Sequence, residues 1–111
     1  MSNLFNRLFK PKEGSLRFNE QMAEKICSHP LKYITEPSEN GDTVIGKGGI
    51  CWLKDGEFSV CSDEKTLFRT DLEDLKAYEL MSLEGAVCEG PDKENGNKNR
   101  CITVFYKYYR K

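Results

Sequence analysis

The chain has 111 residues, a length typical of one domain, and 38% of its side chains are hydrophobic. Its formal net charge of −1 argues against a general polyanion-binding protein. No apolar run approaches the ~20 residues of a membrane-spanning helix, and no secretory signal core is present. The composition is therefore typical of a soluble globular domain.

The charge is spread unevenly along the chain. Residues 1–12 carry three bases and no acid, and residues 100–111 carry four bases and no acid. The body between them therefore has a net charge of −8. Basic ends on an acidic body indicate either solvated termini or contact of the ends with the body or an outside anion.

Residues 2–11 are predicted to form a short amphipathic helix, which Pro11 ends. Its apolar face carries Leu4, Phe5, Leu8 and Phe9. We interpret residues 1–12 as an amphipathic helical segment and residues 15–111 as a single α+β domain. Because so short a helix is marginal alone, we expect it to dock on the protein itself or on a second copy. An anionic membrane surface ranks last, because only three bases flank the apolar face.

A second helix is predicted over residues 19–28, with Asn19 as its N-cap. Pro30 prevents its extension past His29. Its apolar face carries Met22, Ala23, Ile26 and Cys27.

Residues 37–49 have the composition of a loop, and only residues 43–45 are expected to form a short strand within it. The run Gly46-Lys47-Gly48-Gly49 has neither the residue spacing nor the following helix of a phosphate-binding loop. We therefore interpret this run as a flexible entry or bulge before the next strand.

The strongest local signal is a β-hairpin over residues 49–61 with the two-residue turn Asp55-Gly56. This turn places Lys54 opposite Glu57 and leaves Trp52 on the polar face. The other face is wholly apolar and consists of Cys51, Leu53, Phe58 and Val60.

The rest of the chain also favours strands. A short strand is predicted at residues 66–69, and a brief turn followed by a strand is favoured over a helix for residues 72–80. Residues 83–89 and 100–108 are rich in β-branched and aromatic side chains and predict a long hairpin around a mobile loop at residues 90–99.

These elements predict an α+β protein with a curved antiparallel β-sheet or roll of about 5–7 strands and one or two N-terminal helices. The alternative is a small pleckstrin-homology-like barrel, which short meandering strands would suit. The sequence ends on a strand, however, where that barrel would have its closing helix.

The five cysteines are odd in number and contain no CxxC pair, which indicates a reducing cytoplasm and no disulfide scaffold. The single histidine, His29, has no metal-ligand spacing around it, so no metal is expected. If Glu89 faces Arg100 in the last hairpin, Cys88 faces Cys101 and the two thiols form a close pair.

No catalytic constellation is apparent, and no cofactor is expected. Cys27 and His29 point to different faces of a helix, and the acids clustered at residues 71–74 are expected to be solvated. The interpretation therefore leans away from an enzyme.

The pattern favours a non-enzymatic cytoplasmic binding or adaptor domain, which engages a protein partner or a second copy through its open sheet face or its N-terminal helix. Besides the helix, the candidate binding residues are Trp52, Tyr106 and Tyr108. One alternative is a small thiol-dependent enzyme or redox protein that uses Cys88 and Cys101. The other is a single-stranded nucleic-acid binder that uses the aromatic and basic C-terminal strand, and the acidic body argues against it.

Overall fold

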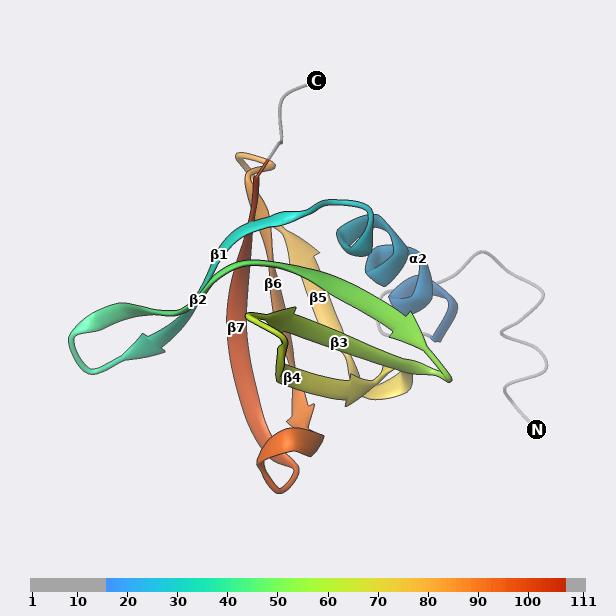
Figure 1. The fold of residues 1–111 in the computed structure, drawn as a ribbon. Helices are drawn as coiled ribbons and strands as arrows, with labels where there is room; N and C mark the ends of the chain where they lie inside the picture. The colour runs from blue at the N-terminus through green and yellow to red at the C-terminus, as the bar shows by residue number, and fades with distance from the viewer. Residues whose placement is uncertain (1–15, 108–111) are drawn as a thin grey trace.

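Helix α2 (Leu16–Cys27) opens the part of the chain, residues 16–107, that the computed structural model describes. Seven strands follow and form one antiparallel sheet in the spatial order β4-β3-β2-β1-β7-β6-β5 (Figure 1). Their bounds are β1 (Leu31–Ser38), β2 (Gly41–Lys54), β3 (Glu57–Ser62), β4 (Lys65–Asp71), β5 (Lys76–Glu79), β6 (Gly85–Asp92) and β7 (Lys98–Tyr106). The predicted α+β class is confirmed, and α2 precedes the strands instead of closing a pleckstrin-homology-like barrel.

Helix α2 ends as expected before Pro30, but its predicted start is wrong. Asn19 is not the N-cap, because it lies inside the helix with 3% of its surface exposed. It shares the buried face with Ala23 and Ile26, and its Nδ2 donates to the carbonyl of Leu72 at 2.7 Å. This tertiary hydrogen bond satisfies a buried amide, which explains why a residue that usually caps helices occupies a helix interior.

The loop predicted over residues 37–49 is also wrong, since β1 and β2 form a hairpin through this region. The glycines that suggested a loop instead allow β2 to bend and pack closely. A Cβ on Gly49 would collide with the carbonyl of Cys61, and a Cβ on Gly46 would lie 2.8 Å from Leu67 Cδ1. Gly49 also has a φ of +132°, a backbone conformation that residues with a side chain rarely adopt. The run from Gly46 to Gly49 is therefore a bend within one long strand.

The β2–β3 hairpin has the predicted register, with Lys54 opposite Glu57 and Trp52 opposite Ser59. Asp55 and Gly56 have φ values of 54° and 77°, as a two-residue hairpin turn of the primed type requires. The following turn-then-strand prediction is confirmed as well, by the single-turn 3-10 helix η1 (Leu72–Asp74) and strand β5.

The β6–β7 hairpin exists, but its predicted register is wrong by one residue. Cys88 lies opposite Ile102, and Cys101 lies opposite Glu89. The strands extend further than expected, because the 3-10 helix η2 (Lys93–Asn95) and Gly96 complete the connection. Since a shift of one residue moves a side chain to the other face, Cys88 and Cys101 do not form the predicted pair.

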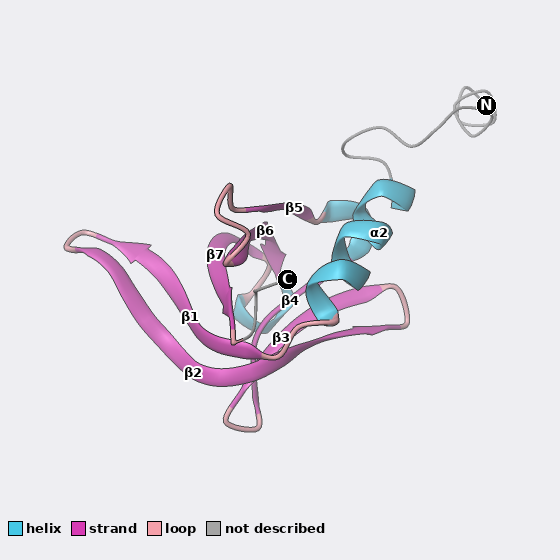
Figure 2. Ribbon diagram, turned by 90° about the horizontal axis from the view of Figure 1, so that it is seen from above, coloured by secondary structure: helices cyan, strands magenta, loops and turns pink. Residues whose placement is uncertain are grey.

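The core lies between the inner face of the curved sheet and the buried face of α2 (Figure 2). Ala23 and Ile26 of α2 are fully buried there, as are Phe58, Phe68 and Ile102 of the sheet. The β1–β2 hairpin extends away from this core (Figure 2). Among residues 16–107, no helix is long and apolar enough to cross a membrane.

Candidate binding surface

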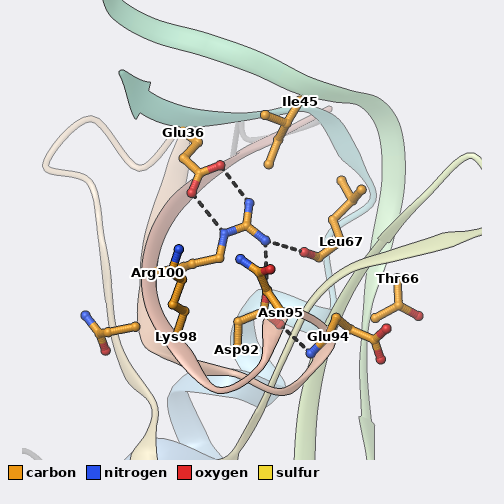
Figure 3. Close-up of a pocket in the computed structure, with 10 residues that line it drawn as sticks. Glu36, Ile45, Thr66, Leu67, Asp92, Glu94, Asn95, Lys98 and Arg100 are labelled. Atoms are coloured by element: carbon orange, nitrogen blue, oxygen red, sulfur yellow. Dashed lines mark hydrogen bonds and ion pairs between the residues drawn. The ribbon is translucent and has the colours of Figure 1, made fainter. Parts of the chain in front are cut away.

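A polar cleft of about 770 Å³ opens where β1 and β7 separate (Figure 3). The pairing of β1 with β7 stops at Thr35 and Thr103, whereas each strand continues along its other neighbour. The cleft is lined by Glu36, Ile45, Thr66, Leu67, Asp92, Glu94, Asn95, Lys98, Asn99 and Arg100.

Arg100 fills the inner wall of this cleft. Its Nε and Nη2 donate to the two carboxylate oxygens of Glu36 at 2.9 and 2.6 Å. Its Nη1 donates to Asp92 Oδ2 at 2.7 Å and to the carbonyl of Leu67 at 2.9 Å. Hydrogen bonding to Glu36, and then to Asp92, raises the pKa of Arg100. The guanidinium is therefore engaged by the protein's own acceptors, and it serves to join β1, β4, β6 and β7.

Asp92 lies beside Arg100 on the inner wall of the cleft. Its side chain is completely buried, and its Oδ1 accepts the backbone N–H groups of Arg69 and Glu94, both at 3.0 Å. The bond to Arg69 ties the end of β6 to the edge strand β4, so the two ends of the curved sheet meet here. The hydrogen bonds at the cleft thus join the two ends of the curved sheet, and the charges of Arg100 and Asp92 there are paired with each other.

A second charge cluster, on β3, β4 and η2, lies beside the cleft and shares Glu94 with it. Lys93 Nζ donates to Glu57 at 2.7 Å and to Asp71 at 2.8 Å, and Arg69 binds Glu57 at 3.1 Å and Glu94 at 2.8 Å. Hydrogen bonds from Lys93 and then Arg69 lower the pKa of Glu57, and the bonds to carboxylates raise the pKa values of Lys93 and Arg69.

The structure forms a thiol contact that the sequence reasoning missed, between Cys27 of α2 and Cys51 of β2. Hydrogen bonding between them lowers the pKa of Cys27 and raises that of Cys51. The sequence placed Cys27 on the apolar face of the helix and Cys51 on the apolar face of the hairpin. Because both faces were expected to point into the core, this orientation could have predicted that the two thiols meet. Burial raises the pKa of Cys88 far above its ordinary value. Within residues 16–107, no group of acidic, histidine or cysteine side chains could hold a metal ion.

The outer face of the sheet carries a row of mostly apolar side chains that crosses five strands. Tyr78 of β5 lies opposite Val87, Val87 opposite Thr103, Thr103 opposite Thr35, and Thr35 opposite Val44 of β2. The neighbouring residues along β6 and β7 are buried in the core, so this row points away from it. Tyr78 and Val44 are 56% and 48% exposed at the two ends of the row, whereas Thr35, next to Val44, is covered and only 6% exposed.

A second, aromatic row lies beside the first on the same face. Phe105 of β7 lies opposite Tyr33 of β1, which lies opposite Lys47 of β2. The two aromatic rings pack with their centroids 4.7 Å apart. We call the exposed and half-buried uncharged members of both rows the outer platform, which comprises Tyr33, Val44, Tyr78, Val87, Thr103 and Phe105.

Trp52 lies on the outer face as well, but beyond the glycine bend of β2. It is 51% exposed and borders a shallow cleft of about 330 Å³ together with Ile50. The bend separates this apolar pair from the outer platform, so the sheet has two apolar outer areas.

Tyr106 does not accompany Trp52 on the outer face. It is 2% exposed on the inner face, where its ring stacks on His29 with the centroids 4.0 Å apart. Alternation along β7 instead places Phe105 outside. The other candidate binding residues lie outside the described residues: Leu4, Phe5, Leu8, Phe9 and Tyr108. Tyr33 was missed because no strand was predicted over residues 31–36. Val44 was missed because its predicted strand, residues 43–45, was expected to be an isolated piece within a loop, whereas it belongs to β2.

No protein-family model, curated protein sequence or solved structure matches this chain. The candidate function therefore rests on the residues and geometry described above.

Proposed function

We propose that this chain is a non-enzymatic binding domain that engages a protein partner through the outer platform. The observation that carries this proposal is the cross-strand row from Tyr78 to Val44, which is apolar along most of its length and exposed at both ends. Protein interfaces have an apolar, aromatic-rich centre with a polar rim, and contiguous apolar surface on a folded domain marks a site of interaction.

The polar cleft supplies less support for a ligand-binding or catalytic role. Its arginine donates four hydrogen bonds to the protein, and its buried aspartate accepts three. The thiol-dependent alternative lacks its nucleophile pair, since Cys88 and Cys101 lie on opposite faces. All five cysteines are free thiols, which supports a reducing, cytoplasmic compartment for the protein.

The proposal is tested by affinity purification from the source cell with quantitation of the bound proteins. The bait variant Val44→Ser/Tyr78→Ser removes the exposed apolar side chain at each end of the row. Leu16→Ser is the control, because it removes an apolar side chain that is 56% exposed on α2, away from the sheet. We expect one or more proteins to be retained by the wild type and the control and to fall about tenfold with the double variant. Circular dichroism and melting curves establish that all three baits are folded. If no protein separates the double variant from the control, the proposal is wrong.

A further inference from the structure

The outer platform has a charged end as well as an apolar surface. Lys47 lies directly opposite Tyr33 on the same face, and Lys32 Nζ lies 5.9 Å from the centroid of the Tyr33 ring. Both lysines are exposed, and neither makes an ion pair within residues 16–107. Arg69, Lys93 and Arg100, in contrast, are all paired with carboxylates.

The acids on the same face do not neutralise this end. Asp42 of β2 lies two residues beyond Val44 and therefore on the opposite side of the apolar row from the lysines. Glu89 of β6 lies opposite both Lys76 and Cys101, and its carboxylate accepts a hydrogen bond from Asn99 at 3.0 Å. Along β6, Glu89 lies beyond Val87 and therefore on the opposite side of the apolar row from Phe105 and the lysines. The platform thus combines apolar side chains on both sides of the threonine Thr103 with one positively charged border.

The composition of the platform favours a peptide over single-stranded nucleic acid. Nucleic-acid platforms stack successive bases on several aromatic rings inside a strongly basic groove. Here the adjacent aromatic pair on the outer face, Tyr33 and Phe105, is already packed ring against ring. The longer row offers one further ring, Tyr78, beside two valines and two threonines. The net charge of the chain is also −1. Aliphatic side chains of a partner match such a row better than bases do.

We infer that the outer platform binds an acidic peptide segment of its protein partner, whose carboxylates meet Lys32 and Lys47 while its apolar side chains cover Val44, Val87 and Tyr78. This inference rests on the proposed function and adds the chemistry of the partner. The two rows are two residues apart along β1 and β7, about 6.6 Å, which is also the spacing of same-face side chains in an extended peptide. On β2 the irregular pairing at Ile45 places them three residues apart. One peptide side chain can therefore contact the apolar row while a carboxylate two residues away reaches the lysines.

Peptide display on the full chain tests the inference without knowledge of the natural partner. Selections use a random peptide library against the wild type, against Lys32→Glu/Lys47→Glu, and against the control Lys65→Glu/Lys98→Glu. The control reverses two exposed lysines away from the platform and changes the net charge equally. We expect the wild type and the control to enrich peptides with Asp or Glu beside apolar residues, and the platform reversal to enrich basic ones.

Binding constants of the selected peptides give the quantitative result. The reversal at Lys32 and Lys47 is expected to weaken an acidic peptide at least about tenfold, and added salt is expected to reduce this difference. Selected peptides that lose their binding in Val44→Ser/Tyr78→Ser but carry no excess of acidic residues would overturn this inference. They would leave the proposed function standing. Failure to enrich any platform-dependent peptide would count against both. Tighter binding of a thymidine oligonucleotide, or a dimer that buries the platform in sedimentation experiments, would replace the acidic peptide as the occupant.

Discussion

Two charge clusters in this protein use the same residue types in different surroundings. The inner cluster joins Arg100 to Glu36 and Asp92, and the side chains of Arg100 and Asp92 are 18% and 0% exposed. The outer cluster joins Arg69 and Lys93 to Glu57, and these three side chains are between 24% and 33% exposed. Contact distances overlap, at 2.6–2.7 Å inside and 2.7–3.1 Å outside.

The comparison shows that distance alone does not set the value of an ion pair. A buried charge that loses its partner remains desolvated, whereas an exposed charge recovers its hydration. The inner cluster therefore holds the closure of the roll, and the outer cluster adds a smaller, solvent-screened contribution. This difference can be tested by breaking each cluster separately.

The largest effect is expected from Arg100→Met, which leaves the buried Asp92 carboxylate without its guanidinium. We expect a loss of about 3–5 kcal/mol in the free energy of unfolding, because an uncompensated buried charge remains. Urea unfolding measures this loss. Arg69→Met is the matched control and should cost clearly less. Equal losses in the two variants would mean that burial does not distinguish the clusters.

Thr70 extends the comparison to a buried polar group with no partner. It is 0% exposed, and its Oγ1 makes no hydrogen bond. Thr70→Val removes this desolvated hydroxyl with little change of shape, so we expect stabilisation of about 1 kcal/mol. Thermal and urea unfolding measure it against Thr66→Val, an exposed control expected to change stability little. Destabilisation by Thr70→Val would indicate that the hydroxyl does have a partner in solution.

The outer cluster predicts a pH dependence of stability. Lys93 and Arg69 lower the pKa of Glu57 below its unfolded value, so its ionised form stabilises the fold above that value, about 4.3. This contribution is lost as the pH falls through the lowered pKa. Glu57→Gln should therefore melt below the wild type at pH 7, and the difference should disappear in acid. A difference that is independent of pH would contradict the ionic origin of the effect.

The smallest energetic consequence concerns the thiols, whose reactivity depends on the same balance of burial and partners. The hydrogen bond to Cys51 lowers the pKa of Cys27, whereas burial raises that of Cys101. Because the thiolate is the reactive form, iodoacetamide should label Cys27 before Cys101 near pH 7.5. Cys88, which is fully buried, should react only on unfolding. Peptide mass spectrometry of timed samples measures the order, and faster labelling of Cys101 would contradict it.

Two local features of this fold, the β2–β3 hairpin and the end of α2, were predictable from the sequence alone. Alternation and the Asp55-Gly56 turn determine the register of the β2–β3 hairpin, since a two-residue turn leaves no freedom in the pairing. Pro30 likewise ends α2, because the residue before a proline disfavours helical backbone. These signals act between residues that are close along the chain.

The tertiary structure alone decided which surfaces those elements present. Asn19 is buried because Leu72 offers an acceptor 53 residues away, and Arg100 is engaged because Glu36, 64 residues away, lies beside it. The β6–β7 register depends on the five-residue connection and the bonds at Asp92, and this register sets which face Cys88 occupies. Whether Phe105 or Tyr106 faces outward follows from what covers the other face. These outcomes depend on contacts between segments that are far apart in the sequence. A local pattern of residues does not determine such contacts, because it acts only on the conformation of neighbouring residues.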